Sequence, residues 1–133
     1  MSRINVTVHK KLVRDNIPSI IASEGKSVKF RSLTDEQEFA NELLEKIGEE
    51  TRELYYALVD FFTAKTKNDV NEDNTAVKEE LADLFEVLYT IAGLIGIDDI
   101  DLVAAIDNKV IDKGSFGKRY FLEEVEEYYN EGE

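Results

Sequence analysis

Hydrophobic residues recur every three or four positions along two long stretches of the chain, and this period predicts two long amphipathic helices. The first helix starts at a cap formed by Thr34 or Asp35 and runs to about Lys67, and the second runs from about Thr75 to Ile95. The polar segment TKNDVNEDNT between them predicts a loop. Because this loop is short, we expect the two helices to pack antiparallel.

The segments before the first long helix predict an extended arm and a short helix. Residues 4–8, INVTV, alternate and are β-branched, which is typical of a short strand or an extended arm. Asn16 is a candidate helix cap, with Pro18 in the first turn and Gly25 at the end. Residues 27–33, SVKFRSL, indicate a second short extended piece.

The remainder of the chain predicts further helices. Asp98 or Asp99 begins a helix that extends to about Asp112, KGSFGKR follows as a loop, and the acidic residues 121–130 predict a last helix. The pattern therefore predicts an all-α fold, a helical bundle whose two long antiparallel helices follow a short extended N-terminal segment. At this length we expect a single domain, residues 1–133.

The composition is that of a folded, acidic protein. A hydrophobic content of 43% argues against disorder, although 34% of the residues are charged. The formal net charge of −13 argues against a nucleic acid partner, because that affinity rests on basic surface. The chain has no cysteine and no apolar run of membrane-spanning length. We therefore expect a cytoplasmic protein with no membrane partner.

The charge and the apolar surface are both unevenly spread. Residues 1–33 carry a net charge of +5 and the remainder −18, which fits self-complementarity or a polyanion clamp. The second long helix stays apolar outside its main stripe, so it needs cover on several sides. We expect a homodimer or a higher homo-oligomer, unless the third helix covers that face. The residues concerned are Leu81, Phe85, Leu88, Tyr89 and Ala92.

Each long helix carries an acid inside its apolar stripe. With about 100° per residue, Glu50 lies at the centre of the first stripe, Glu53 roughly 60° to one side and Glu49 roughly 100° to the same side. The second helix repeats the pattern with Glu80 at the centre, Asp83 about 60° away and Glu79 about 100° away.

A carboxylate that faces a core costs several kcal/mol unless a cation accompanies it. We expect neither stripe to supply a lysine or arginine, so a divalent cation is the predicted partner. Four acids at i and i+3 on two antiparallel helices can converge on one site, and oxygen ligands suit Mg²⁺ or Mn²⁺. The single histidine, His9, is expected at the surface, which argues against zinc and against a di-iron site.

Three motifs together resemble a known family. EExxE at 49–53 with ExxD at 80–83 is similar to the acidic motif of the all-α nucleoside triphosphate pyrophosphohydrolases, the MazG-like superfamily. KLVRDNIP at 11–18 and KGSFGKRYFL at 113–122 resemble the ends of its phosphoribosyl-ATP pyrophosphohydrolase-like branch. The branch usually has Arg-Gly-Gly-Phe where this chain has Lys113-Gly114-Ser115-Phe116, which replaces a bidentate fork with a point charge.

The resemblance implies Mg²⁺-dependent hydrolysis of a nucleoside triphosphate, canonical or non-canonical, to the monophosphate and pyrophosphate. Matched position by position, the metal ligands would be Glu50, Glu53, Glu80 and Asp83. Glu49 would hold or deprotonate the attacking water, with Glu79 ranked below it. The residues expected to bind phosphate are Lys11 and Arg14, followed by Lys109, Lys113, Lys118 and Arg119.

Two other functions fit the same residues. The first is the phosphoribosyl-ATP pyrophosphohydrolase of histidine biosynthesis, which shares the acidic helices. The second is a non-catalytic acidic helical protein that binds metal or a partner. Gly48, next to the acidic motif, should cost its helix about 1 kcal/mol relative to Ala, and the sequence offers either close backbone approach or simple tolerance as its reason.

Overall fold

The computed structural model describes residues 3–66 and 73–130, and within these ranges the chain is all-helical, with four helices and no strand. The all-α prediction is therefore confirmed. The chain divides into two compact units, Met1–Gly96 and Ile97–Glu133. The expectation of a single domain stays a prediction. No helix among the described residues is both long and apolar enough to cross a membrane.

The long helix α2, Glu36–Thr66, begins at the second of the two predicted caps. Asp35 accepts hydrogen bonds through Oδ1 from the backbone N–H groups of Gln37 (2.8 Å) and Glu38 (3.1 Å). These bonds satisfy two of the amide groups that a helix start leaves free, and Glu36 and Glu38 complement its dipole. The polar loop predicted after α2 lies mostly outside the described residues.

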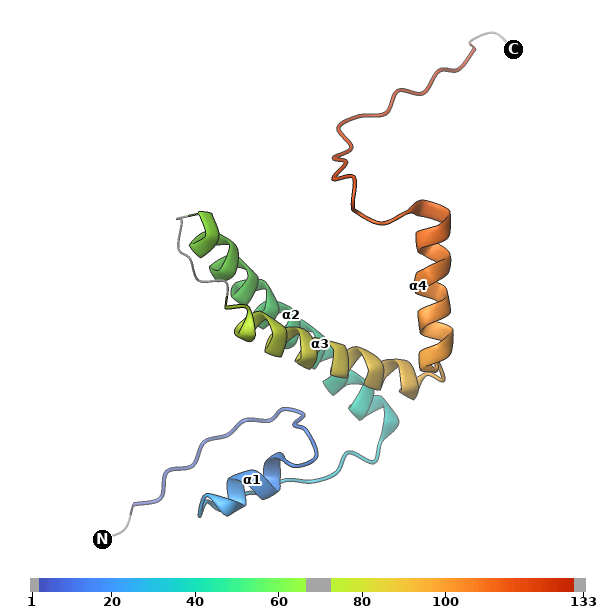
Figure 1. Ribbon diagram of the computed structural model, residues 1–133. Helices are drawn as coiled ribbons and strands as arrows, with labels where there is room; N and C mark the ends of the chain where they lie inside the picture. The colour runs from blue at the N-terminus through green and yellow to red at the C-terminus, as the bar shows by residue number, and fades with distance from the viewer. Residues whose placement is uncertain (1–2, 67–72, 131–133) are drawn as a thin grey trace. The chain divides into compact units, whose positions relative to one another are not determined.

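Helix α3, Thr75–Leu94, matches the predicted second long helix. Asp73 accepts from the backbone N–H of Thr75 (3.0 Å) at its start. Gly96 has φ +83°, a conformation that an L side chain rarely adopts, and it turns the chain away after the helix. Helices α2 and α3 lie side by side and form the packed pair of the first unit (Figure 1). Leu43 of α2 and Ala92 of α3 are the buried apolar residues in the described chain.

The N-terminal region matches the predicted arm and short helix, with two corrections. Residues 4–8 are irregular, so the strand alternative is wrong, and α1 spans Ile17–Ser23 with Pro18 in its first turn. Asn16 occupies the cap position, but its side chain makes no capping hydrogen bond. Its backbone is already helical (φ −88°, ψ −7°), whereas a capping side chain needs extended backbone to reach the amides ahead.

The second unit contains α4, Asp99–Lys113, with Asp98 as the cap that accepts from the N–H of Asp101 (2.8 Å). Gly114 ends it with φ +81°. The helix predicted over residues 121–130 is wrong, because this segment is irregular. Its four glutamates repel at helical spacing, and so short a segment needs tertiary packing to stay helical.

Candidate metal centre

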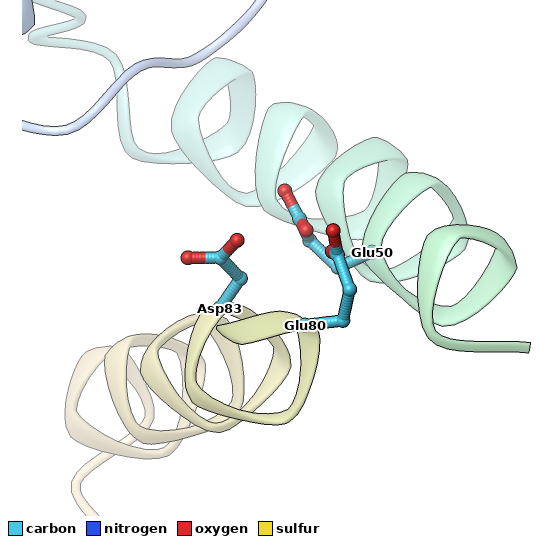
Figure 2. A group of neighbouring side chains, drawn as sticks. All are labelled: Glu50, Glu80 and Asp83. Carbon is cyan, nitrogen blue, oxygen red and sulfur yellow. The ribbon is translucent and has the colours of Figure 1, made fainter. Parts of the chain in front are cut away.

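Three carboxylates from the two packed helices meet at one point. Glu50 of α2 and Glu80 and Asp83 of α3 each offer an oxygen, and these oxygens lie within 4.8 Å of one another. Figure 2 shows the three side chains converging in the space between the helices. The i and i+3 spacing of Glu80 and Asp83 puts both on the side of α3 that faces α2.

Burial leaves two carboxylate oxygens of these residues without a partner. Glu50 is only 8% exposed. Its Oε2 atom and the Oε2 atom of Glu80 are buried, and no hydrogen-bond donor in the described chain reaches either one. A buried polar oxygen of this kind costs about 1 to 3 kcal/mol, and more when it is charged. The cluster therefore needs a proton or a cation to be stable.

The raised pKa values of Glu50 and Glu80 also show that burial disfavours their charged forms. Burial is the main cause that raises the pKa of Glu50, followed by the negative charge of Glu53, while the charge of Lys46 opposes the rise. Burial also comes first in raising the pKa of Glu80, followed by a carboxyl–carboxyl hydrogen bond with Glu53 and by the nearby negative charges. The clustered carboxyl groups thus oppose one another's ionisation, and a bound cation would relieve that opposition.

Lys46 is a cation that the sequence interpretation missed. Its Nζ atom lies 3.6 Å from Oε1 of Glu50 and 3.4 Å from Oε2 of Glu49, and its side chain is only 16% exposed. The expectation that neither stripe supplies a lysine is wrong. Lys46 lies four residues before Glu50, about 40° from it on the helix, so the i, i+4 rule was the signal. One charge cannot neutralise the whole cluster.

The remaining acids of the motif surround the three-acid cluster. Glu53 does not share the mutual 4.8 Å distance, but it is close enough to raise the pKa values of Glu50 and Glu80. Glu49 is partly exposed and pairs with Lys46 and, at 3.8 Å, with Lys11. Glu53 thus lies beside the cluster, and Glu49 lies next to it with two lysines, Lys11 and Lys46, as its partners.

The predicted phosphate-binding residues fall into two groups. Arg14 donates from Nη2 to Oδ1 of Asp83 (2.7 Å), and Lys11 pairs with Glu49, so both lie at the acidic motifs. The other four belong to the second compact unit, and their role stays a prediction: Lys109, Lys113, Lys118 and Arg119. Within that unit, Nζ of Lys118 lies 5.8 Å from the ring centre of Tyr120.

The donor set fits a hard divalent cation. Every group in the cluster is a carboxylate, the ligand that Mg²⁺ and Mn²⁺ favour, and His9 is exposed in the N-terminal arm. The two unpartnered oxygens are the places where a cation would remove the cost of burial. The residues therefore fit a metal of this class, while its identity is not fixed by the geometry.

Comparison with known proteins identifies a family. A family model described as phosphoribosyl-ATP pyrophosphohydrolase matches residues 26–110. This range includes all of α2 and α3 and both acidic motifs, whereas KLVRDNIP and KGSFGKRYFL lie outside it. Neither the curated proteins nor the solved structures gave a match.

Proposed function

We propose that this chain, which belongs to the phosphoribosyl-ATP pyrophosphohydrolase family of the MazG-like all-α superfamily, hydrolyses a nucleoside triphosphate to the monophosphate and pyrophosphate with Mg²⁺. The family implies a pyrophosphohydrolase. The triphosphate substrate and the identity of the metal are the proposal, with Mn²⁺ as the expected substitute. In this reaction a water oxygen forms a bond to phosphorus, a P–O–P bridge breaks, and a proton is released.

One observation carries the proposal. Two buried carboxylate oxygens belong to Glu50 and Glu80, which cluster with Asp83, and neither oxygen has a donor among the described residues. An acidic cluster alone would be ordinary surface chemistry. Buried oxygens that remain unsatisfied support a bound cation, because removing several charges from water without a partner is costly.

The roles of the acids follow from their positions. Glu50, Glu80 and Asp83 would hold the metal, and Glu53, which lies beside them, would complete the set. A bound Mg²⁺ supplies charge neutralisation to the phosphate oxygens. Glu49 lies outside the buried cluster and is partly exposed, which suits a group that orients water and accepts its proton. Glu79 is the lower-ranked candidate for that role.

The cations around the cluster suit a triphosphate. Lys11 and Arg14 reach the acidic motifs from the N-terminal arm, and we assign them to phosphate binding. The planar guanidinium of Arg14 can bind a phosphate in a bidentate manner. We also assign phosphate contacts to Lys113, Lys118 and Arg119, on the basis of the resemblance of residues 113–122 to the branch's C-terminal loop, and to Lys109 near the end of α4.

A second candidate substrate is phosphoribosyl-ATP, as in histidine biosynthesis. The description of the matched family favours it, and the acidic motifs support it equally. The discriminating experiment incubates the purified chain with Mg²⁺ and a panel of canonical nucleotides, damaged nucleotides and phosphoribosyl-ATP, and follows pyrophosphate release. Turnover of triphosphates supports the first candidate, and turnover of phosphoribosyl-ATP alone supports the second. No turnover would overturn both and leave a non-catalytic metal-binding protein.

We also propose that the chain self-associates through the apolar surface of its long helices. Tyr55, Tyr56 and Phe62 of α2 are each about 60% exposed, and Phe85 of α3 is 53% exposed. Aromatic side chains this exposed on two packed helices are typical of an interaction surface, and a second copy of the same helices would cover them. Sedimentation velocity should show a dimer or a larger species that Phe62→Ser weakens. A monomer at high micromolar concentration would contradict the proposal.

A further inference from the structure

The N-terminal segment reaches both acidic motifs although it lies outside the family match. Arg14 hydrogen-bonds Asp83 on α3, across a sequence separation of 69 residues. Three residues earlier, Lys11 pairs with Glu49 on α2. The matched range begins only at residue 26, so this attachment is an addition to the shared acidic helices. It places two positive charges where a metal and its substrate would bind.

We propose that Arg14 is an internal competitor for the metal, which holds Asp83 when no divalent cation is bound and is released when one binds. The proposal rests on the proposed function, because it takes the metal site from there. Its new content is that the chain sets its own metal affinity with a residue outside the acidic motifs, and that metal binding frees the N-terminal segment.

The contacts suit an exchange of this kind. The side chains of Arg14 and Asp83 are 58% and 41% exposed, and a pair this accessible to water is weak and easily displaced. Asp83 is also one of the three acids whose oxygens lie within 4.8 Å of one another. A cation bound at Asp83 repels the guanidinium and draws charge from the carboxylate, so the metal and Arg14 compete for Asp83. One carboxylate then changes partner from Arg14 to the metal.

The released guanidinium has a second use. A free Arg14 beside the bound metal can take up a phosphate oxygen pair of the substrate, so the cation that opposes metal binding would favour triphosphate binding. Removal of Arg14 should therefore tighten the binding of the metal alone and weaken the use of the nucleotide. Opposite signs in the two measurements distinguish this role from a simple structural one.

The first test measures binding of Mn²⁺ alone to the full chain by calorimetry, without nucleotide. Arg14→Ala should tighten binding about two- to five-fold, the size expected for loss of an exposed pair. Lys10→Ala is the matched control, since it removes the same charge from the same segment, and none of the ion pairs in the described chain involves Lys10. It should change the affinity less than Arg14→Ala does.

The second test uses limited trypsin digestion of the wild-type chain with and without Mn²⁺. Cleavage after Lys11 and Arg14 should accelerate when the metal is added, while cleavage after Lys29 serves as the internal reference. Equal or weaker metal binding by Arg14→Ala, or slower cleavage with metal, overturns the inference while the metal site stands. Absence of metal binding to the wild-type chain overturns the inference and the proposed function together.

Discussion

The two acidic motifs have the same helical pattern but different counter-ions. In α2, Lys46 lies one helical turn before Glu50 and pairs with it at 3.6 Å. In α3, the equivalent position is an alanine, and Glu80 has no cation of its own helix beside it. The α3 motif instead receives Arg14, which arrives from the N-terminal arm and binds Asp83.

This difference shows how the two halves of one site depend on different levels of structure. A lysine at i, i+4 is held near its glutamate by the helix itself, before any tertiary contact forms. The cation of the α3 motif is Arg14, and the N-terminal arm must fold against α3 before this pair can form. The α3 half is therefore the part whose charge is most open to change by a metal, a proton or a movement of the arm.

The largest expected effect tests whether the two halves act as one site. Glu50→Gln and Glu80→Gln should each abolish detectable Mg²⁺ or Mn²⁺ binding and lower kcat/KM for the best nucleotide by more than about 100-fold, because even groups behind metal ligands cost about 10- to 100-fold. Calorimetry and pyrophosphate release measure the two effects. Glu45→Gln, an exposed acid on the same helix, is the control and should change neither. A variant that keeps full metal affinity would remove its residue from the site.

The sequence predicted the helices and the acids well because both depend on local spacing. The caps at Asp35 and Asp98 and the ends near Gly96 and Gly114 follow from rules that act within a few residues. The convergence of Glu50 on the α3 acids also follows, because two amphipathic stripes that pack must bring their centres together.

The features that the sequence did not predict have other causes. The contact between Arg14 and Asp83 depends on the path of the N-terminal arm, which no periodic pattern records. The pairing of Lys46 with Glu50 could have been predicted from their spacing of four residues. From sequence alone, however, a lysine inside an apolar stripe is easily taken for a surface residue at the edge of the stripe. Residues 121–130 failed as a helix because their charge pattern opposes it and local propensity alone does not hold so short a segment.

A smaller effect concerns the stability of the metal-free protein. Because folding raises the pKa values of Glu50 and Glu80, their contribution to stability is complete below about pH 4.3, the unfolded value, and declines as the pH rises through the folded value. Glu50→Gln or Glu80→Gln should thus stabilise the metal-free chain at neutral pH. For either glutamate, each unit by which the folded-state pKa exceeds the unfolded-state pKa corresponds to about 1.4 kcal/mol of free energy of unfolding. Urea unfolding in chelator at pH 4 and pH 7.5 measures it.

The same experiment separates the two halves through Lys46. In a Lys46→Met background, Glu50→Gln should gain more stability at pH 7.5, because the charge that offset Glu50 is gone. The gain from Glu80→Gln should not change, since Lys46 does not pair with it. If Lys46→Met changes both stability gains equally, Lys46 serves both glutamates, and the two acidic motifs do not have different counter-ions. Gains that persist at pH 4 would show that ionisation is not the cause.

The smallest effect concerns a glycine in each helix. A Cβ atom added at Gly48 of α2, or at Gly93 of α3, would meet no atom within 4 Å, so no close approach within the described chain requires either glycine. Gly48 is well inside α2, whereas Gly93 is in the last turn of α3, where helix propensity matters less. Gly48→Ala should therefore raise the free energy of unfolding by about 1 kcal/mol, and Gly93→Ala by less. If Gly48→Ala instead lowers turnover or self-association while stability rises, then a nucleotide or a second copy must approach the backbone beside Glu49, and the glycine belongs to the site rather than to the helix.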